Sequence, residues 1–327
     1  MIRGLLFALL LSASALLLDG QLEIVPLFQD AFQRLYGESA HFNALLDERL
    51  PRLIVLLCSG ASLAVSGAVM QSLLNNPLAS PGVLGITAGG SLAVLIVFLT
   101  GKHLEVPLLI PFAAVLGCFL TLGLVTSLSR GRLGLSVASL ILTGIAISTL
   151  FVAVQGALVY CYRDDWTLLQ LLTEWQAGST FNRTWQHVHM QLPLTLVGLW
   201  TVFFYRSELN LLSLGEEEAK SLGVDVATVR SRLFIAVALL SGGALAALGI
   251  VAFFGLILPH ITRALTGPNH LKLIPTLTLS GALTMCVLDL AIRKSELHFL
   301  TIGNVSAILG GLFFFLLLAG RREEAYA

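Results

Sequence analysis

Residues 53–74 read LIVLLCSGASLAVSGAVMQSLL, a stretch of 22 residues without a charged side chain. A helix of about 20 apolar residues crosses the hydrocarbon layer of a membrane, so this stretch is long enough for one crossing. Comparable apolar runs recur along the whole chain, at residues 4–18, 83–100, 108–128, 136–160, 188–205, 233–254, 273–292 and 302–319. The sequence therefore predicts an all-α, polytopic membrane protein with a single transmembrane domain over residues 1–327.

The composition agrees with this fold class and excludes several functions. Hydrophobic residues make up 56% of the chain and charged residues only 12%, against about a quarter in an average soluble domain. Lys and Arg together number 19, as do Asp and Glu, so the basic excess typical of nucleic-acid binding is missing. No CxxC pair occurs, and we expect small buried hydrophobic side chains rather than disulfides or metal ligands at most of the four cysteines, Cys58, Cys118, Cys161 and Cys286.

Two segments decide the number of crossings. Gly255–Leu265 is half the usual length and contains Pro259, so we expect a short helix that reverses direction and brings the count to ten. Nine crossings is the competing count. The run at residues 4–18 follows Arg3, and it is either a cleavable secretory signal or, as we favour, a retained first span.

Charged residues orient the chain in the membrane. The turn at Ser129–Leu133 and the Arg321-Arg322 pair are short and basic, which places them in the cytoplasm together with the N-terminus. In this topology the hydrophilic stretches at residues 19–52 and 160–187 lie outside, and the stretch at residues 206–232 lies inside.

The long inside loop carries the signals of a short helix. Acidic residues at Glu216–Glu218 follow Ser213 and Gly215, which is typical of a helix start with a capping residue. Gly223 supplies a left-handed stop. A helix delimited at both ends and lying outside the membrane is expected of a docking element.

Motifs for catalysis are missing from the sequence. There is no Gly-x-x-x-x-Gly-Lys phosphate loop, and Gly101-Lys102 lacks the earlier glycine. The mid-span polar residues are the neutral Gln71 and Gln155, and Asp289 lies near the outer end of its run. We therefore expect a transport subunit rather than an enzyme. A secondary transporter or channel that works without an ATPase is the alternative, but it would favour an intramembrane charge or a pair of broken helices.

The run at residues 136–160 has a face of small polar residues. Ser136, Ser139 and Thr143 follow the three-to-four spacing that places side chains on one side of a helix. Close helix packing and the lining of a transport pathway both explain such a face, and the sequence leaves both open.

At this point the sequence resembles the membrane-spanning permeases of the FecCD type, which are ATP-driven importers of iron–siderophores, haem and cobalamin. The resemblance covers nearly the whole chain and depends on the order and spacing of individually weak motifs. These motifs are Arg49-Leu-Pro-Arg52, Gly60-Ala61, Ser66-Gly67, Gln71, Asn76-Pro-Leu-Ala79, Pro81, Leu84-Gly85, Leu214-Gly-Glu-Glu-Glu-Ala219, Ser221-Leu-Gly223, Phe254-Gly-Leu-Ile-Leu-Pro-His260, Arg263, Asp289 and Arg293.

The resemblance implies a cobalamin-permease-like, type II importer fold in the inner membrane of a bacterium. It also implies several partners: membrane lipid, a second permease subunit (identical or different), a cytoplasmic ATPase dimer that carries ATP and magnesium, and an external substrate-binding protein. This chain itself would hold no cofactor, metal or nucleic acid. A ferric siderophore is the expected substrate, followed by haem and cobalamin.

The resemblance also assigns roles to single residues. It implies ATPase docking by Leu214, Gly215, Glu216, Glu217, Glu218, Ala219, Leu222 and Gly223. It implies binding-protein docking by Arg49, Arg52 and Arg293, which anchoring at lipid headgroups would explain as well. A cytoplasmic gate and pathway would include Asn76, Pro77, Leu78, Ser139 and Thr143, although a plain turn explains the prolines of the loop equally well.

One segment departs from the family pattern. Phe299-Leu-Thr-Ile-Gly303 stands where the family has Glu-Leu-Pro-x-Gly, and Leu312 replaces a second proline. Without those prolines the last helix should start more regularly. We have no mechanistic role for His260, and we expect it to be packed and hydrogen-bonded.

Overall fold

The computed structural model describes residues 2–17, 42–102, 104–131, 134–135, 137–295, 297 and 299–324, and within them it is a bundle of helices. Only one short hairpin interrupts the described helices, where β1 (Arg130–Gly131) pairs antiparallel with β2 (Gly134–Leu135). The helical elements are α1 (Ile2–Leu17), the π-helical turn η1 (Leu45–Arg49), α3 (Leu50–Leu73), α4 (Ile86–Leu99), α5 (Leu109–Leu128), α6 (Val137–Cys161), α7 (Trp166–Gln176), α8 (Trp185–Phe204), α9 (Arg206–Leu212), α10 (Glu216–Ser221), α11 (Val226–Leu248), α12 (Phe254–Thr266), α13 (His270–Lys294) and α14 (Ile302–Glu324).

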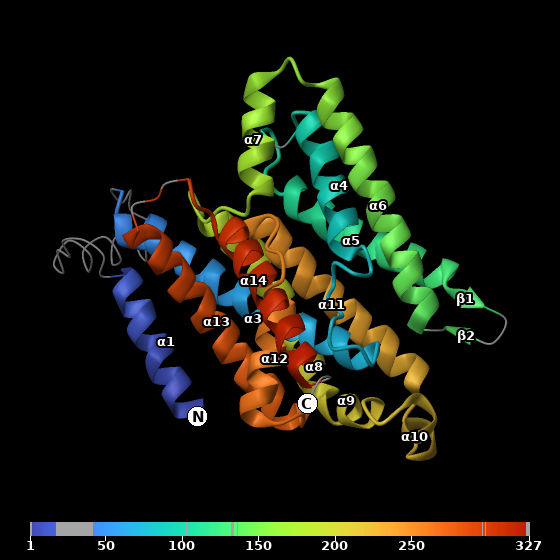
Figure 1. Cartoon of the computed structure of the whole chain (residues 1–327). Coiled ribbons are helices and arrows are strands. Elements are labelled where there is room, and N and C mark those ends of the chain that lie inside the picture. Colours follow the sequence, from blue (N-terminus) through green and yellow to red (C-terminus); the bar gives the residue numbers. More distant parts are fainter. Residues whose placement is uncertain are drawn as a thin grey trace.

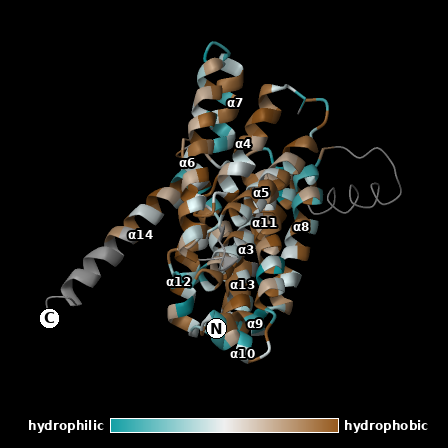
Figure 2. Cartoon of the chain, turned by 90° about the vertical axis from the view of Figure 1, so that its right-hand side faces the viewer, coloured by the Kyte–Doolittle hydropathy of each residue, from teal (hydrophilic) through white to brown (hydrophobic). Residues whose placement is uncertain are grey.

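The lengths of these helices agree with a protein that crosses a membrane many times. Among the described residues five helices are long and apolar enough for a full crossing: η1 with α3, α5, α6, α11 and α13. The pair α8 and α9 forms a sixth candidate, bent by 58°. α1, α4 and α14 contribute shorter apolar segments, and α12 has 13 residues with Pro259 inside it. Figure 2 shows hydrophobic residues along most helices and hydrophilic residues gathered near α9 and α10.

The two ends of the bundle are named here after the short helices that mark them, the α7 end and the α10 end (Figure 1). In that view α1 begins and α14 ends toward the α10 end. α12 begins beside the middle of α3, where Gly255 meets Gly67, and it reaches the α10 end, where Arg263 donates to Gln71 over 2.8 Å. The half-length segment therefore runs opposite to α11, as predicted. The count of ten crossings stays a prediction, since several of the segments it includes are shorter than a full crossing.

The centre of the bundle is α3, which packs against α8, α11, α12 and α13. In its most apolar window 89% of the residues are buried. Small side chains allow these helices to approach closely: a Cβ added to Gly67 would lie 1.6 Å from the carbonyl oxygen of Gly255. Polar side chains inside the bundle pair between helices, as Gln191 of α8 does when it donates to Ser59 Oγ over 2.6 Å.

The helix α6 lies at the edge of the bundle and packs against α4 and α5 (Figure 1). Only 17% of its apolar window is buried within the chain. Large apolar side chains on its open face include Leu142, Ile145, Leu150 and Val152. Since lipid or another protein must cover such a surface, α6 is the span most available to a neighbour.

The turn between α11 and α12 is irregular backbone held at the α7 end. A Cβ added to either Gly178 or Gly303 would lie 2.5 Å from the carbonyl oxygen of Ile250. Thr301 Oγ1 donates to the carbonyl of Ala177 over 2.5 Å, and the amide of Gly303 donates to Gly178 over 3.2 Å. Three distant parts of the chain therefore meet here: the loop after α7, the turn after α11 and the start of α14.

Several sequence expectations can be compared with the structure. Cys58, Cys118 and Cys286 are buried free thiols, as expected, whereas Cys161 is exposed. α14 runs without a break from Ile302, in agreement with the loss of the family prolines. The expectation for His260 is wrong: it is exposed, and its ring meets Phe313 edge-on at 5.5 Å, because Pro259 and not His260 faces the bundle.

Two sequence expectations concern residues that the structure does not describe. Most of the expected outside stretch at residues 19–52 lies outside the described residues, as does Ser136 of the small polar face.

Candidate functional site

The helix α10 is delimited at both ends, as the sequence predicts, but its first cap differs. Gly215 is the N-cap, whereas Ser213 donates to the carbonyl of Asn210 over 2.6 Å and caps nothing. At the other end Gly223 has φ +84°, and the amide of Val224 donates to the carbonyl of Ala219 over 3.0 Å. This closing pattern, with glycine in the left-handed region, ends the helix after a turn and a half.

Ion pairs hold α10 to α11 at the α10 end. Glu216 Oε2 accepts from Arg230 Nη2 over 2.7 Å, and its other oxygen lies 3.2 Å from Lys220 Nζ. The hydrogen bond from Arg230 lowers the pKa of Glu216, and the bond from Lys220 adds to the effect. Glu216, predicted to dock an ATPase, pairs with the chain's own α11 while 41% of its side chain stays exposed, and its docking role stays a prediction.

The outward face of this region is partly apolar. Leu214 and Leu222 are 64% and 60% exposed on either side of α10, while Ala219 between them is fully buried. We call the exposed set the α10 surface; its members are Leu214, Glu217, Glu218 and Leu222. Exposed leucines beside acidic side chains, outside the apolar spans, are typical of a protein contact.

A buried polar cluster fixes α9 below the bundle, and the sequence analysis did not find it. The ring of His270 lies 2.9 Å from Asn210 Oδ1 through Nδ1 and 2.6 Å from Ser72 Oγ through Nε2. The backbone amide of His270 also donates to Asn210 Oδ1, over 2.7 Å. The cluster joins α3, α9 and α13, so hydrogen bonds hold α9, the helix that precedes the α10 surface, in place. A polar residue at each of three helix ends was the only sequence signal.

The predicted gate loop follows α3 at the same end. Asn76 Oδ1 accepts from the amide of Leu78 over 2.9 Å, the side-chain turn expected of asparagine, and Pro77 and Leu78 are exposed. Further along, the loop packs on α6, where a Cβ added to Gly144 would lie 2.4 Å from the carbonyl oxygen of Val83. The structure therefore brings the loop and α6 together.

The small polar side chains of α6 are more exposed than the buried Gly144 on the same helix. Ser139 and Thr143 are both half-buried. Close packing therefore accounts for Gly144, whereas the side chains of Ser139 and Thr143 keep part of their surface for another contact. The pathway role remains a prediction.

At the α7 end the three predicted docking arginines differ in environment. Arg52 is only 6% exposed. Its Nη2 donates to Asp289 Oδ1 over 2.6 Å and to Thr180 Oγ1 over 2.8 Å, and its guanidinium carbon lies 5.5 Å from the centre of the Phe181 ring. The expected position of Arg52 at an exposed rim is wrong, since a buried carboxylate holds it inside.

Arg49 and Arg293 remain accessible from outside. Both are half-buried, Arg49 in the turn before α3 and Arg293 in the last turn of α13. Arg293 shares a small cleft with Arg52, Thr180 and Phe181. The structure thus groups two of the three arginines, and Arg293 is the more exposed of these two.

The chain is similar to known transport proteins over nearly its whole length. The model of the FecCD transport family matches residues 5–320. Similar proteins include the hemin transport system permease protein HmuU of Yersinia pestis, 36% identical over 90% of this chain and 89% of the relative. The vitamin B12 import system permease protein BtuC of Vibrio vulnificus is 35% identical over 98% and 94%. The Fe(3+) dicitrate transport system permease protein FecD of Escherichia coli is 36% identical over 86% and 87%.

Solved structures give the same result for the fold. A chain described as a metal-chelate type ABC transporter in an inward-facing conformation superposes with a TM-score of 0.82 at 30% identity, covering 97% of this chain and 98% of the other. PsaBC of Streptococcus pneumoniae, in complex with a Fab, matches with a TM-score of 0.59 at 20% identity over 90% and 95%, a likeness of fold alone.

Proposed function

Because the chain belongs to the FecCD transport family, we propose that it moves a ferric siderophore across the bacterial inner membrane, driven by a separate ATPase. The motif-based resemblance is confirmed, and the chain is a multi-pass ABC transporter permease of the siderophore, haem and B12 import type. What we propose beyond this is the substrate, the partners and the alternating-access mechanism.

The α10 surface is the observation that carries the proposed ATPase contact. Leu214 and Leu222 are exposed on a helix that is capped by Gly223 and fixed to α11 by Glu216. A short helix held at several points moves as a unit, so a push on it reaches α11 directly. The sequence holds no phosphate loop, and a partner would supply the nucleotide site.

The open face of α6 supports a second permease subunit. Its exposed leucines need a cover, and the gate loop packs on the same helix at Gly144. We propose that two subunits meet along α6 and enclose a pathway bordered by Ser139, Thr143 and the loop at Asn76-Pro77-Leu78. Closing of the ATPases would tilt these helices and open the pathway on alternate sides.

The outer arginines support contact with a binding protein at the α7 end. Arg49 and Arg293 are half-buried, and Arg293 lines a small open cleft. Charge-assisted pairs at such a rim steer docking and fix its orientation more than they add affinity. Arg52 supports the cleft from inside by holding Thr180.

Replacing Leu214 and Leu222 with aspartate tests the ATPase contact. The double variant should copurify with at least roughly tenfold less ATPase than the unmodified chain, the loss expected when contacts at the centre of an interface are removed. Leu104→Asp is the matched control, since Leu104 is 79% exposed in the turn between α4 and α5. Full ATP-driven uptake by the double variant would contradict the contact.

Uptake by sealed vesicles separates the proposal from a secondary transporter. Vesicles that contain the purified chain without ATPase or ATP should take up no ferric siderophore, and uptake by this chain alone would overturn the proposed drive. Growth of a deletion strain under iron limitation on defined chelates tests the substrate. A defect only with haem, or only without cobalamin, would replace the siderophore by that ligand.

A further inference from the structure

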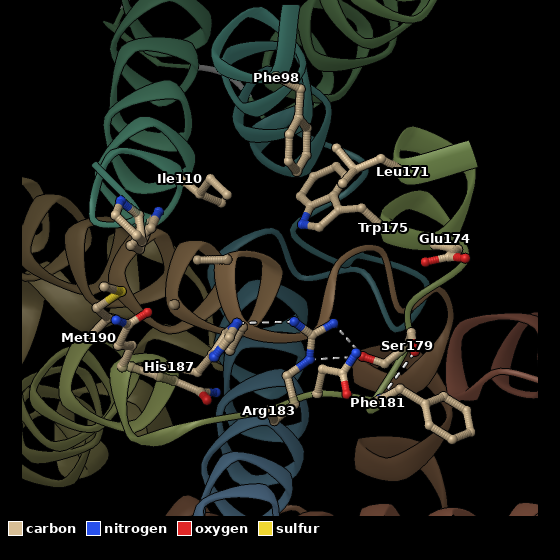
Figure 3. Close-up of a pocket in the computed structure, with 18 of the residues that line it drawn as sticks. Phe98, Ile110, Leu171, Glu174, Trp175, Ser179, Phe181, Arg183, His187 and Met190 are labelled. Carbon is tan, nitrogen blue, oxygen red and sulfur yellow. Dashed lines mark hydrogen bonds between the residues drawn. The ribbon is translucent and has the colours of Figure 1, made fainter. Parts of the chain in front are cut away.

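A cavity of about 340 Å³ lies at the α7 end, on the side of α7 that faces the bundle. Five helices enclose it: the end of α4, the start of α5, α7, α8 and the end of α11. One wall is apolar and includes Phe98, Ile110 and Leu171, while the opposite wall carries Arg183, His187 and Ser179 (Figure 3). Leu194 also lines the cavity. Its size and its division into an apolar and a polar wall are those of a small-molecule site.

The cation of this wall, Arg183, is held by hydrogen bonds. Arg183 donates to the carbonyl of Ser179 through Nε over 3.2 Å and Nη2 over 2.8 Å, and its Nη1 lies 3.1 Å from His187 Nε2. Within the described part of the chain it forms no ion pair, although Glu174 lines the same cavity. Burial lowers the pKa of Arg183 to about 10, and the charge of Arg52 adds to the effect, so Arg183 stays protonated at neutral pH.

Two further polar groups of the cavity wall are left without partners. Trp175 Nε1, a donor, and Gln191 Oε1, an acceptor, are buried and form no hydrogen bond with the described residues. Trp175 and Gln191 are 8% and 1% exposed. In Figure 3 the indole nitrogen of Trp175 is on the side of its ring that faces Arg183 and His187. Buried donors without acceptors are rare in folded proteins, and a ligand is one of the few explanations.

The charges at this end are unequal. Asp289 neutralises Arg52, whereas none of the carboxylates that the structure describes forms an ion pair with Arg183. We propose that the cavity binds an anionic group, a phosphate or a carboxylate, that carries an apolar body. The anion pairs with Arg183, and the apolar body fills the space between Phe98, Ile110 and Leu194.

Two sources offer this chemistry: the phosphate headgroup of an anionic lipid, and a soluble amphiphilic carboxylate. The cavity lies within one chain and away from the open face of α6. The inference therefore does not rest on the proposed transport function. A bound anion would join α7 to the loop that leads into α8, because Trp175 is in α7 and Arg183 is in that loop.

Native mass spectrometry of the full-length chain in neutral detergent tests the site. The probes are phosphatidylglycerol, zwitterionic phosphatidylcholine and decanoate, a soluble amphiphilic carboxylate. Phosphatidylglycerol or decanoate should bind at least roughly tenfold more tightly than phosphatidylcholine, and Arg183→Gln should remove this preference, as expected for the loss of one charge-assisted hydrogen bond. Preference for the lipid assigns a lipid site, and preference for decanoate assigns a soluble ligand.

Three further variants keep the result interpretable. Arg163→Gln removes an exposed arginine in the turn before α7 and should change nothing. Ala246→Phe fills the cavity without touching its charge and should block both probes, which decides the question if Arg183→Gln fails to fold. Arg183→Lys should keep part of the preference. Equal binding of all probes, no binding, or full binding by Ala246→Phe would overturn the proposal.

Discussion

Each end of the bundle has an ion pair within the chain that includes a residue of the sequence motifs, Arg52 at the α7 end and Glu216 at the α10 end, and the two pairs differ in burial. At the α7 end the Arg52–Asp289 pair has side chains only 7% and 2% exposed. At the α10 end the Arg230–Glu216 pair has side chains 11% and 41% exposed. The first pair joins helices that are 237 residues apart in sequence, whereas the second joins neighbouring helices 14 residues apart.

The difference in burial predicts how much each pair contributes to the stability of the folded chain. A fully buried pair has been removed from water on both sides, so either partner left alone is costly. A half-exposed pair keeps much of its hydration, so its loss is a small, local effect. The residues that we propose as partner contacts are instead near each pair: Arg293 at one end, and Leu214 and Leu222 at the other.

The largest expected effect is that of breaking the buried pair. Arg52→Ala should lower the free energy of unfolding by about 3–5 kcal/mol, because it leaves the Asp289 carboxylate buried without its cation. Denaturant unfolding of the purified chain in mixed micelles measures this loss. A change below about 1 kcal/mol, the level of an exposed pair, would remove the contrast between the two ends.

The double variant Arg52→Met with Asp289→Leu is the control for this prediction. It should recover most of the stability, because an apolar pair of similar size avoids the cost of burying charge. Arg52 Nε and Asp289 Oδ2 already lack hydrogen-bond partners among the described residues, so the native pair is not an ideal one.

A second experiment tests whether the loss of stability depends on the burial of the polar residue or on the end of the bundle where it lies. His270 is buried at the α10 end, and His270→Ala removes the partner of both Asn210 and Ser72. We expect a loss of about 1–3 kcal/mol, since buried polar groups would remain unsatisfied. The same unfolding assay measures it, with the exposed His260→Ala as control. An unchanged midpoint would show that the cluster does not brace α9.

The half-exposed pair should matter less. Glu216→Gln should cost about 0.2–1 kcal/mol, the range of ion pairs near solvent, and the loss should be confined to α10. Amide hydrogen exchange locates it: residues 216–221 should exchange faster while α3 is unaffected. The neighbouring exposed acid serves as control, since Glu218→Gln breaks no ion pair that the structure describes. Faster exchange throughout the bundle would contradict a local role.

The smallest effect is the pH dependence of this pair. The hydrogen bond from Arg230 lowers the pKa of Glu216, so the pair stabilises the folded chain above the ordinary pKa of glutamate. This contribution is lost as the pH falls through the lowered value. The exchange difference between the unmodified chain and Glu216→Gln should therefore disappear in acid. A difference that persists there would assign the effect to packing.

The sequence was sufficient for features determined by neighbouring residues. The lengths of the apolar runs predicted membrane-spanning helices, Gly223 predicted the end of α10, and Asn76 predicted the turn of the gate loop. Pro259 and the half-length run around it gave the reversal of α12. In each case the physical cause lies within a few residues, so the local pattern contains the information.

Contacts between helices that are far apart in the sequence could not be predicted from local sequence patterns. The partner of Arg52 is on α13 and that of His270 is on α9, and nothing local specifies either pairing. An arginine before an apolar run therefore looked like a rim residue. The cavity around Arg183 was missed for the same reason, since its walls come from five separate segments.

The meeting of Gly178, Ile250 and Gly303 has a consequence for how the chain is made. The turn after α11 is complete only when it is covered by the loop after α7 and by the start of α14. During synthesis Ile250 leaves the ribosome well before Gly303, so the carbonyl of Ile250 waits uncovered while α12 and α13 insert. Folding of this end is therefore complete only once the last helix is in place, and truncation before α14 would leave the turn after α11 without that part of its cover.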